Sequence, residues 1–202
     1  MRRRVFLLGL PLALAGCGSV LERPYVARQD WALSVPPPPA EADAPERKGR
    51  KVLLVRSMLA APVLGDRGLL TLGADGTMTT SFYERWAVPP ADGVGAALAQ
   101  FLARSGLFAA VLAPGSLAEA DLALEPDLLQ LWAEPAAGRA VASLSIVLLA
   151  TRSQTARVLL QATETAAVPL AGQGTEAEVH AELAALAEVF RKVEDALAPF
   201  AA

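Results

Sequence analysis

The chain has 202 residues, of which 53% are hydrophobic, and its formal net charge is −3 at pH 7. This length suits one domain, and a chain so apolar and weakly charged is expected to bury a core. One cysteine excludes an intramolecular disulfide, and one histidine excludes a histidine-rich metal cage. The excess of acidic over basic residues, 21 to 18, argues against a nucleic-acid partner.

The first sixteen residues are organised like a lipoprotein signal peptide. Residues 1–4 contain three arginines, and residues 5–15 form an apolar stretch that is too short to span a membrane. The order Leu-Ala-Gly-Cys ending at Cys17 is similar to the lipobox of bacterial lipoproteins. We therefore expect residues 1–16 to be removed and Cys17 to be acylated. A buried N-terminal helix that contains a cysteine is the alternative.

Acylation of Cys17 predicts a membrane anchor, because two or more acyl chains hold a protein firmly. The only thiol is then consumed by lipid, which suits an oxidising compartment of the cell envelope. Gly18 occupies the position where an Asp would resemble an inner-membrane retention signal, so the outer membrane, facing the periplasm, is favoured. Arg3-Arg4-Val5-Phe6-Leu7 also resembles a twin-arginine core, and this leaves the export route open.

Residues 17–49 are expected to form a lipid-anchored tether with a Pro-rich spacer. Four prolines at 36–39 favour polyproline II, which makes the spacer semi-rigid. Inside the tether, one edge strand is predicted by the alternation of Trp31, Leu33 and Val35.

The folded domain is expected to cover residues 50–202. Its first strand is predicted at 52–55, a continuous apolar run. A hairpin follows, with strands at 69–72 and 77–87 and regular alternation of side chains along the second strand. The two glycines of the turn at 73–76 support this assignment.

Helical spacing of apolar residues predicts a helix that Asp92 caps and that ends at Gly106. A short strand is expected at 107–111. Three longer strands follow, and their short links suit antiparallel pairing; they are predicted at 122–132, 141–151 and 157–168. Pro126 is expected at a bulge or at an edge of the sheet.

The last helix carries the clearest pattern. Thr175 to Glu178 has the form of a capping box, and an apolar stripe repeats in steps of four and three from Val179 to Leu197. The stripe favours burial against the sheet, and a short coiled coil is the alternative. The predicted fold class is α+β: a mixed, largely antiparallel sheet with two helices on one face, preceded by the signal peptide and tether. The other face is expected to be solvated, covered by the tether or used for assembly.

No arrangement of residues in the sequence predicts catalysis, a metal site or a cofactor. The chain has no phosphate-binding loop and no G-x-S-x-G motif. His180 lies off the apolar stripe and is expected to be solvated. The glutamates of the last helix are expected to form a solvated acidic side; they are Glu176, Glu178, Glu182 and Glu188. A non-enzymatic protein is therefore favoured over an envelope hydrolase.

The hairpin region contains the candidate partner-binding residues. Aromatic and arginine side chains are over-represented at binding hot spots, and apolar side chains near this turn could form a docking edge. The candidates are Arg67, Leu69, Tyr83, Arg85 and Trp86. The alternatives are that Trp86 anchors the core and that the hairpin folds back on it.

Several of these motifs together resemble the ABC-type transport auxiliary lipoprotein family. They are the apolar strand at 52–55, the turn at 62–67, the Arg-Trp-Ala-x-Pro-Pro sequence at 85–90 and the segment at 105–108. The family includes paraquat-inducible protein C-like lipoproteins, which work with mammalian-cell-entry (MCE) transport proteins. One departure is Trp31-Ala32-Leu33, where the family commonly has Tyr-x-Leu closer to the cysteine.

The resemblance implies a non-catalytic periplasmic subunit, anchored to the outer membrane, that docks onto an MCE-domain protein. Such systems move lipids or other hydrophobic compounds across the envelope, and a separate subunit hydrolyses ATP. Self-association into a homo-oligomer would fit this role. Two further hypotheses are an activator of a cell-wall synthase and a carrier that holds lipid in an apolar cavity.

Overall fold

The computed structural model describes residues 25–35, 49–152 and 157–202, and within these ranges the chain forms nine strands and two α-helices. In chain order they are β1 (Gln29–Trp31), β2 (Val52–Val55), β3 (Leu59–Ala60), β4 (Gly68–Leu72), β5 (Met78–Trp86), α1 (Pro90–Ser105), β6 (Ala110–Leu112), β7 (Leu122–Glu134), β8 (Arg139–Ala150), β9 (Arg157–Pro169) and α2 (Thr175–Leu197). The predicted signal peptide, Cys17 and the four prolines lie outside the described residues.

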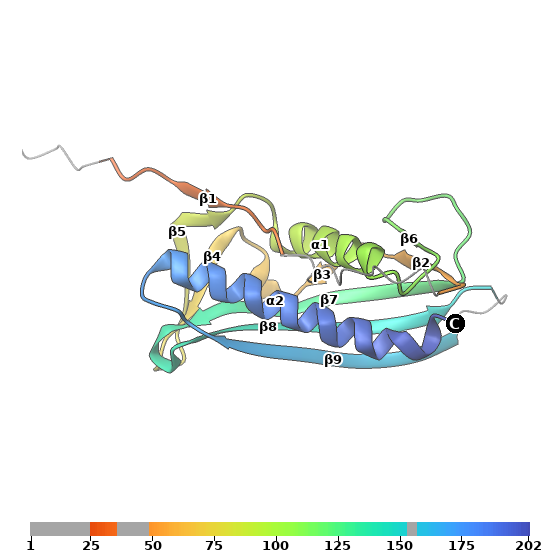
Figure 1. Ribbon diagram of the computed structural model, residues 1–202. Coiled ribbons are helices and arrows are strands. Elements are labelled where there is room, and N and C mark those ends of the chain that lie inside the picture. Colours follow the sequence, from red (N-terminus) through yellow and green to blue (C-terminus); the bar gives the residue numbers. More distant parts are fainter. Residues whose placement is uncertain (1–24, 36–48, 153–156) are drawn as a thin grey trace, which may run out of the picture.

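The strands form one mixed sheet, and both helices cover the same face of it (Figure 1). The order runs β1-β5-β4-β7-β2-β6, with β8 beside β7 and β9 beside β8. The longest ladders, β7–β8 and β8–β9, are antiparallel, whereas β2 and β3 pair parallel with β7. The predicted α+β class is therefore confirmed, with β1–β5 at one side of the sheet and β2–β6 at another.

The apolar stripe of α2 packs on the long strands β7, β8 and β9. Val179, Leu186, Phe190 and Leu197 are fully buried, as their spacing predicts. Phe190 also meets Phe101 of α1 edge to face, with ring centroids 5.6 Å apart. The stripe therefore builds the core of the domain and not a coiled coil.

The predicted helix starts were wrong in detail. The helix α1 begins at Pro90, and Asp92 lies inside its first turn without making a side-chain cap. Proline suits the first helical position because its fixed φ is preorganised and its missing N–H is not needed there. In α2, Thr175 is the first helical residue and Gly174 precedes it, so no capping box forms. Gly106 ends α1 in the left-handed conformation, as predicted.

Pro126 sits inside β7, where it faces a gap between β2 and β3. The carbonyls of Leu124 and Leu128 accept hydrogen bonds from Arg56 N and Ala61 N, at 2.9 Å each. Because backbone groups alternate along a strand, the nitrogen of Pro126 lies on the same edge of β7 as these two carbonyls, between the two hydrogen bonds. No strand needs an N–H at that point, so the proline is tolerated within a long central strand.

The strand predicted at 31–35 is shifted toward the N-terminus. The structure has it at Gln29–Trp31, paired parallel with the last three residues of β5. Leu33 and Val35 follow outside the strand and pack, half-buried, against the core. The sheet thus includes a strand from the segment that was expected to be a tether.

Candidate docking surfaces

Strand β5 contains a large bulge, which breaks the predicted alternation of its side chains. Gly68 pairs with Arg85, and Leu70 pairs with Thr80, so the single residue Leu69 stands opposite the four residues 81–84. The backbone bulges outward there and leaves Phe82 and Tyr83 in solvent, 63% and 44% exposed. Their rings meet edge to face, with centroids 5.1 Å apart.

Gly68 allows the two strands to approach closely beside this bulge. A Cβ at this position would lie 2.3 Å from the carbonyl oxygen of Ser81 and 2.6 Å from Cγ2 of Thr80. The hydroxyl of Ser81 in turn accepts a hydrogen bond of 3.0 Å from the backbone N–H of Glu84. The bulge is therefore held by local contacts at both of its ends.

Strand β1 is fastened to the same part of β5 through side chains as well as backbone. Arg85 forms an ion pair with Asp30 at 2.9 Å, and the indole N–H of Trp31 donates to Glu84 at 2.8 Å. The N–H of Ala87 donates to the carbonyl of Trp31 at 2.7 Å. The chain that leads toward Cys17 is thus joined to the sheet at this edge.

The structure separates the five predicted partner-binding residues into two groups. Leu69 and Trp86 are buried in the core, where neither side chain can contact a partner directly. Arg67 and Arg85 line one small hollow of about 310 Å³, together with Asp66 and Ser81 of the bulge. Tyr83 is exposed beside them.

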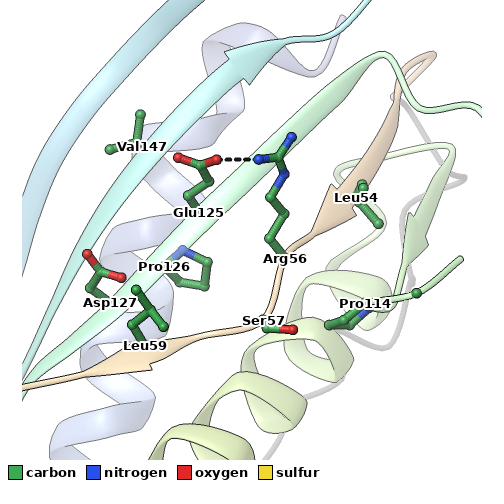
Figure 2. A pocket seen from close by; sticks show the side chains of 10 residues that line it. Leu54, Arg56, Ser57, Leu59, Pro114, Glu125, Pro126, Asp127 and Val147 are labelled. Atoms are coloured by element: carbon green, nitrogen blue, oxygen red, sulfur yellow. Dashed lines mark hydrogen bonds and ion pairs between the residues drawn. The ribbon is translucent and has the colours of Figure 1, made fainter. Parts of the chain in front are cut away.

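A second surface lies on the sheet face that carries no helix. Leu124 and Leu128 point into the core, so alternation turns Glu125 and Asp127 of β7 to the opposite face. Together with β2, β3, β8 and the start of the loop after β6, these residues line a trough of about 560 Å³ (Figure 2). Its apolar side chains are Leu54, Leu59, Pro114, Pro126 and Val147.

The trough combines apolar and charged groups. Arg56 and Glu125 form an ion pair across it at 2.5 Å, and Asp127 is exposed nearby (Figure 2). Leu59 is 69% exposed, so the trough presents an apolar side chain to solvent. Mixed surfaces of this kind are typical of non-obligate protein interfaces.

Within the described ranges, no group of three or more histidine, cysteine, aspartate or glutamate side chains could hold a metal ion. His180 is exposed, as expected. Glu182 is an exception to the expected acidic surface, since it is 1% exposed and its Oε2 has no hydrogen-bond partner among the described residues. Desolvation, and next the charge of Glu178, raises the pKa of Glu182 well above its usual value.

Sequence reasoning did not identify Phe82 and Leu59 as exposed surface residues. Phe82 lay within a regular predicted strand, and Leu59 lay outside every predicted element. The alternation of β5 gave no sign of the bulge, which depends on its pairing with β4 and β1. Among the described residues, neither helix combines the length and the hydrophobicity that a membrane span requires.

Comparisons with known proteins agree with this architecture. Residues 31–194 match the family of the ABC-type transport auxiliary lipoprotein component. A crystal structure of a Xanthomonas campestris protein of the DUF330 family superposes with a TM-score of 0.67 at 25% identity, covering 82% of this chain and 92% of that one. No curated protein matches the chain.

A second crystal structure, of an uncharacterized protein, gives a TM-score of 0.60 at 12% identity and covers 87% of this chain and all of that one. It supports the fold alone. The family match begins at the last residue of β1 and includes nearly all of α2, so it contains the residues of the hollow beside the bulge and of the trough. The chain thus belongs to the family of ABC-type transport auxiliary lipoprotein components.

Proposed function

We propose that this protein is a non-catalytic, lipid-anchored subunit that docks onto the MCE-domain protein of an ABC transport system. The system would move lipids or other hydrophobic compounds across the envelope, and Cys17 would hold the subunit at the outer membrane. The family match over residues 31–194 is the observation that carries this proposal.

The mechanism is tethering. An acylated Cys17 confines the domain to the membrane surface, and this raises its effective concentration near any partner in the same envelope. In this proposal the folded domain contributes a surface for docking, and no step of the transport reaction is assigned to its residues. The contribution to transport would thus be positional.

The trough is the surface that we assign to the partner. It lies beside β2, away from the edge where β1 leads toward the anchor, so an anchored domain can present it to a protein in the periplasm. Leu59 would supply the apolar contact, and the Arg56–Glu125 pair would set the register.

The test is cross-linked affinity purification of the lipidated protein from its own envelope, followed by mass spectrometry. We expect an MCE-domain protein together with its permease and ATPase. Recovery of a cell-wall synthase would support the alternative function, and recovery of the bait alone would contradict docking.

A matched pair of variants assigns the surface. Leu59→Asp places a charge in the trough and is expected to lower partner recovery at least about tenfold, the effect of one hot-spot residue. Leu117→Asp is the control, because Leu117 is fully exposed and lies outside the trough. Equal recovery with both variants would show that the partner binds elsewhere.

A further inference from the structure

Exposed aromatic and basic side chains gather at the edge of the sheet that leads toward the anchor. We call the five residues Tyr25, Val26, Arg28, Phe82 and Tyr83 the aromatic patch. The guanidinium of Arg28 lies 4.2 Å from the ring centre of Phe82, and Phe82 contacts Tyr83. Tyr25 is 91% exposed and comes three residues before Arg28. The patch is thus one surface built from two segments far apart in the sequence.

Packing of the domain does not account for these side chains. Phe82 and Tyr83 occupy the bulge of β5, where four residues stand opposite one, and regular pairing would not place both rings in solvent. Bulges commonly re-aim side chains near functional surfaces. Aromatic rings with a polar group or a neighbouring cation are the side chains that favour the boundary between lipid and water.

The covalent chain keeps the patch close to the predicted anchor. Only eight peptide bonds separate Cys17 from Tyr25. Even when fully extended, eight residues span at most about 29 Å, which is comparable to the diameter of a small domain. This limit holds for any conformation of the intervening residues, so an acylated Cys17 keeps Tyr25 within this distance of the bilayer.

Charged groups of both signs adjoin the patch. Arg67 and Arg85 line the hollow beside the bulge, and the buried Nε of Arg85 has no hydrogen-bond partner among the described residues. Asp30 pairs with Arg85, and Asp66 lines the same hollow, so the carboxylates offset part of this charge. With Arg28, three arginines face the three carboxylates of Asp30, Asp66 and Glu84, so the charges of this edge balance, which suits zwitterionic phospholipid headgroups that carry both signs of charge.

We propose that the aromatic patch is a bilayer-contacting surface that lays the domain on phospholipid headgroups beside its own acyl anchor. This inference rests on the acylation of Cys17 in the proposed function. Tyr83 would then face lipid and not the protein partner. The anchor would fix the position of the domain, and the patch would fix its orientation, with the trough directed away from the membrane.

The test uses the lipidated protein in partner-free vesicles that contain zwitterionic and anionic phospholipids. Cys17 is the only cysteine, so in the acylated chain an introduced cysteine is the only free thiol. A nitroxide is attached to Val26→Cys or, as the control, to Leu117→Cys. We expect residue 26 to be more accessible to oxygen than to a water-soluble nickel complex, and residue 117 to show the reverse. Equal aqueous exposure at both positions would overturn the proposal.

A second variant separates the patch from the anchor. Phe82→Ser with Tyr83→Ser is expected to return the residue 26 label to water and to lower vesicle flotation of the non-acylated Cys17→Ser mature chain about tenfold. The matched control, Leu117→Ser with Val158→Ser, removes two exposed apolar side chains elsewhere and should change neither. If residue 26 remained in the interface after loss of both rings, the anchor alone would place it there, and the patch would have no such role.

The failures of the two proposals are distinguishable. Mass spectrometry of the mature N-terminus tests acylation directly, and a chain without acyl groups would contradict the anchor while flotation still tests the patch. The Phe82→Ser/Tyr83→Ser variant is also purified from the envelope. Loss of the MCE-domain protein with unchanged vesicle contact would show that the patch binds protein, which would overturn the lipid assignment.

Discussion

The two ends of the strand order β1-β5-β4-β7-β2-β6 both expose apolar side chains, but they do so in different ways. At β1–β5, four residues of β5 bulge opposite one residue of β4, and aromatic rings project outward. At β2–β6, a gap between β2 and β3 opposite Pro126 helps to form a trough with mixed apolar and charged walls. In each case an interruption of regular strand pairing creates the exposed surface.

The difference suggests a division of roles. The aromatic patch lies on the segment that leads to the predicted anchor, whereas the trough lies on the helix-free face beside β2. A protruding patch suits a broad surface such as a bilayer, and a trough suits a partner's side chains. The following variants test this comparison, from the largest expected effect on stability to the smallest.

Trp86→Ala should remove the main packing residue of the anchor-side edge. Trp86 is 2% exposed, so its truncation is expected to lower the free energy of unfolding by about 3–5 kcal/mol. Tyr83→Ala, three residues away and exposed, should cost less than about 0.5 kcal/mol. Urea denaturation measures both values. Similar costs would show that Tyr83 belongs to the core and would remove it from the aromatic patch.

Gly68→Ala should disturb the bulge that presents the patch. The added Cβ would meet the Ser81 carbonyl at 2.3 Å, and the backbone must shift, at a cost of about 1–3 kcal/mol in unfolding free energy. Vesicle contact should fall with it, while partner recovery through the trough stays unchanged. Gly172→Ala is the control, because its Cβ would make only an ordinary contact at 3.8 Å. Unchanged stability in Gly68→Ala would contradict the close approach of β4 and β5.

Glu182→Gln tests the α2 helix, which packs on the long strands β7, β8 and β9. Burial raises the pKa of Glu182, so the folded state binds its proton more tightly than the unfolded state. The wild-type protein should therefore lose stability relative to the variant as pH rises from about 4 through the raised pKa, by about 1 kcal/mol or more. Thermal melts between pH 4 and 8 measure this. Glu176→Gln, at an exposed position, is the control, and parallel curves for wild type and Glu182→Gln would contradict the prediction.

Arg56→Gln should have the smallest effect on stability and a larger one on partner recovery. The two side chains of the Arg56–Glu125 pair are 49% and 41% exposed, and such pairs contribute about 0–1 kcal/mol. Chemical denaturation should hardly change, whereas co-purification of the MCE-domain protein should decrease. If Arg56→Gln bound the partner normally, the partner would contact only the apolar side chains of the trough.

Vesicle contact sharpens the same comparison. Arg56→Gln should leave it unchanged, since Arg56 lies beside β2 and the patch lies beside β1. A loss of vesicle contact in this variant would show that the two surfaces are coupled, and the division of roles would no longer hold.

Much of the fold could be predicted because periodic patterns report local geometry. The stripe of α2, the hairpin glycines and the three long strands each contain enough repeats to identify the element. The helix starts were less predictable: Asp92 and Thr175 are good caps by residue type, but each lies inside its helix. The residues that directly precede α1 and α2 are Pro89 and Gly174, and neither provides a side-chain cap, so a search for capping side chains places both starts too late.

The exposure of the candidate partner-binding residues was predicted in part, and their binding role stays a prediction. Arg67 and Arg85 share a hollow and Tyr83 is exposed, but Trp86 and Leu69 serve the core. Residue type alone cannot distinguish these outcomes, since tryptophan and leucine suit both a core and a binding hot spot. Glu182 shows the reverse case, a charged residue type that folding buries.

The order of residues was enough to indicate the α+β class, the apolar faces of both helices and the resemblance to the auxiliary lipoproteins, because these depend on neighbours within a few turns or strands. Tertiary structure decided which strand β1 pairs with, where β5 bulges and which face of the sheet contains the trough. The bulge depends on the pairing of β5 with β4, and the other two features depend on pairing between residues more than fifty positions apart, such as Asp30 with Arg85 and Arg56 with Glu125. Such pairings form only when the whole sheet is assembled, so no local pattern contains them.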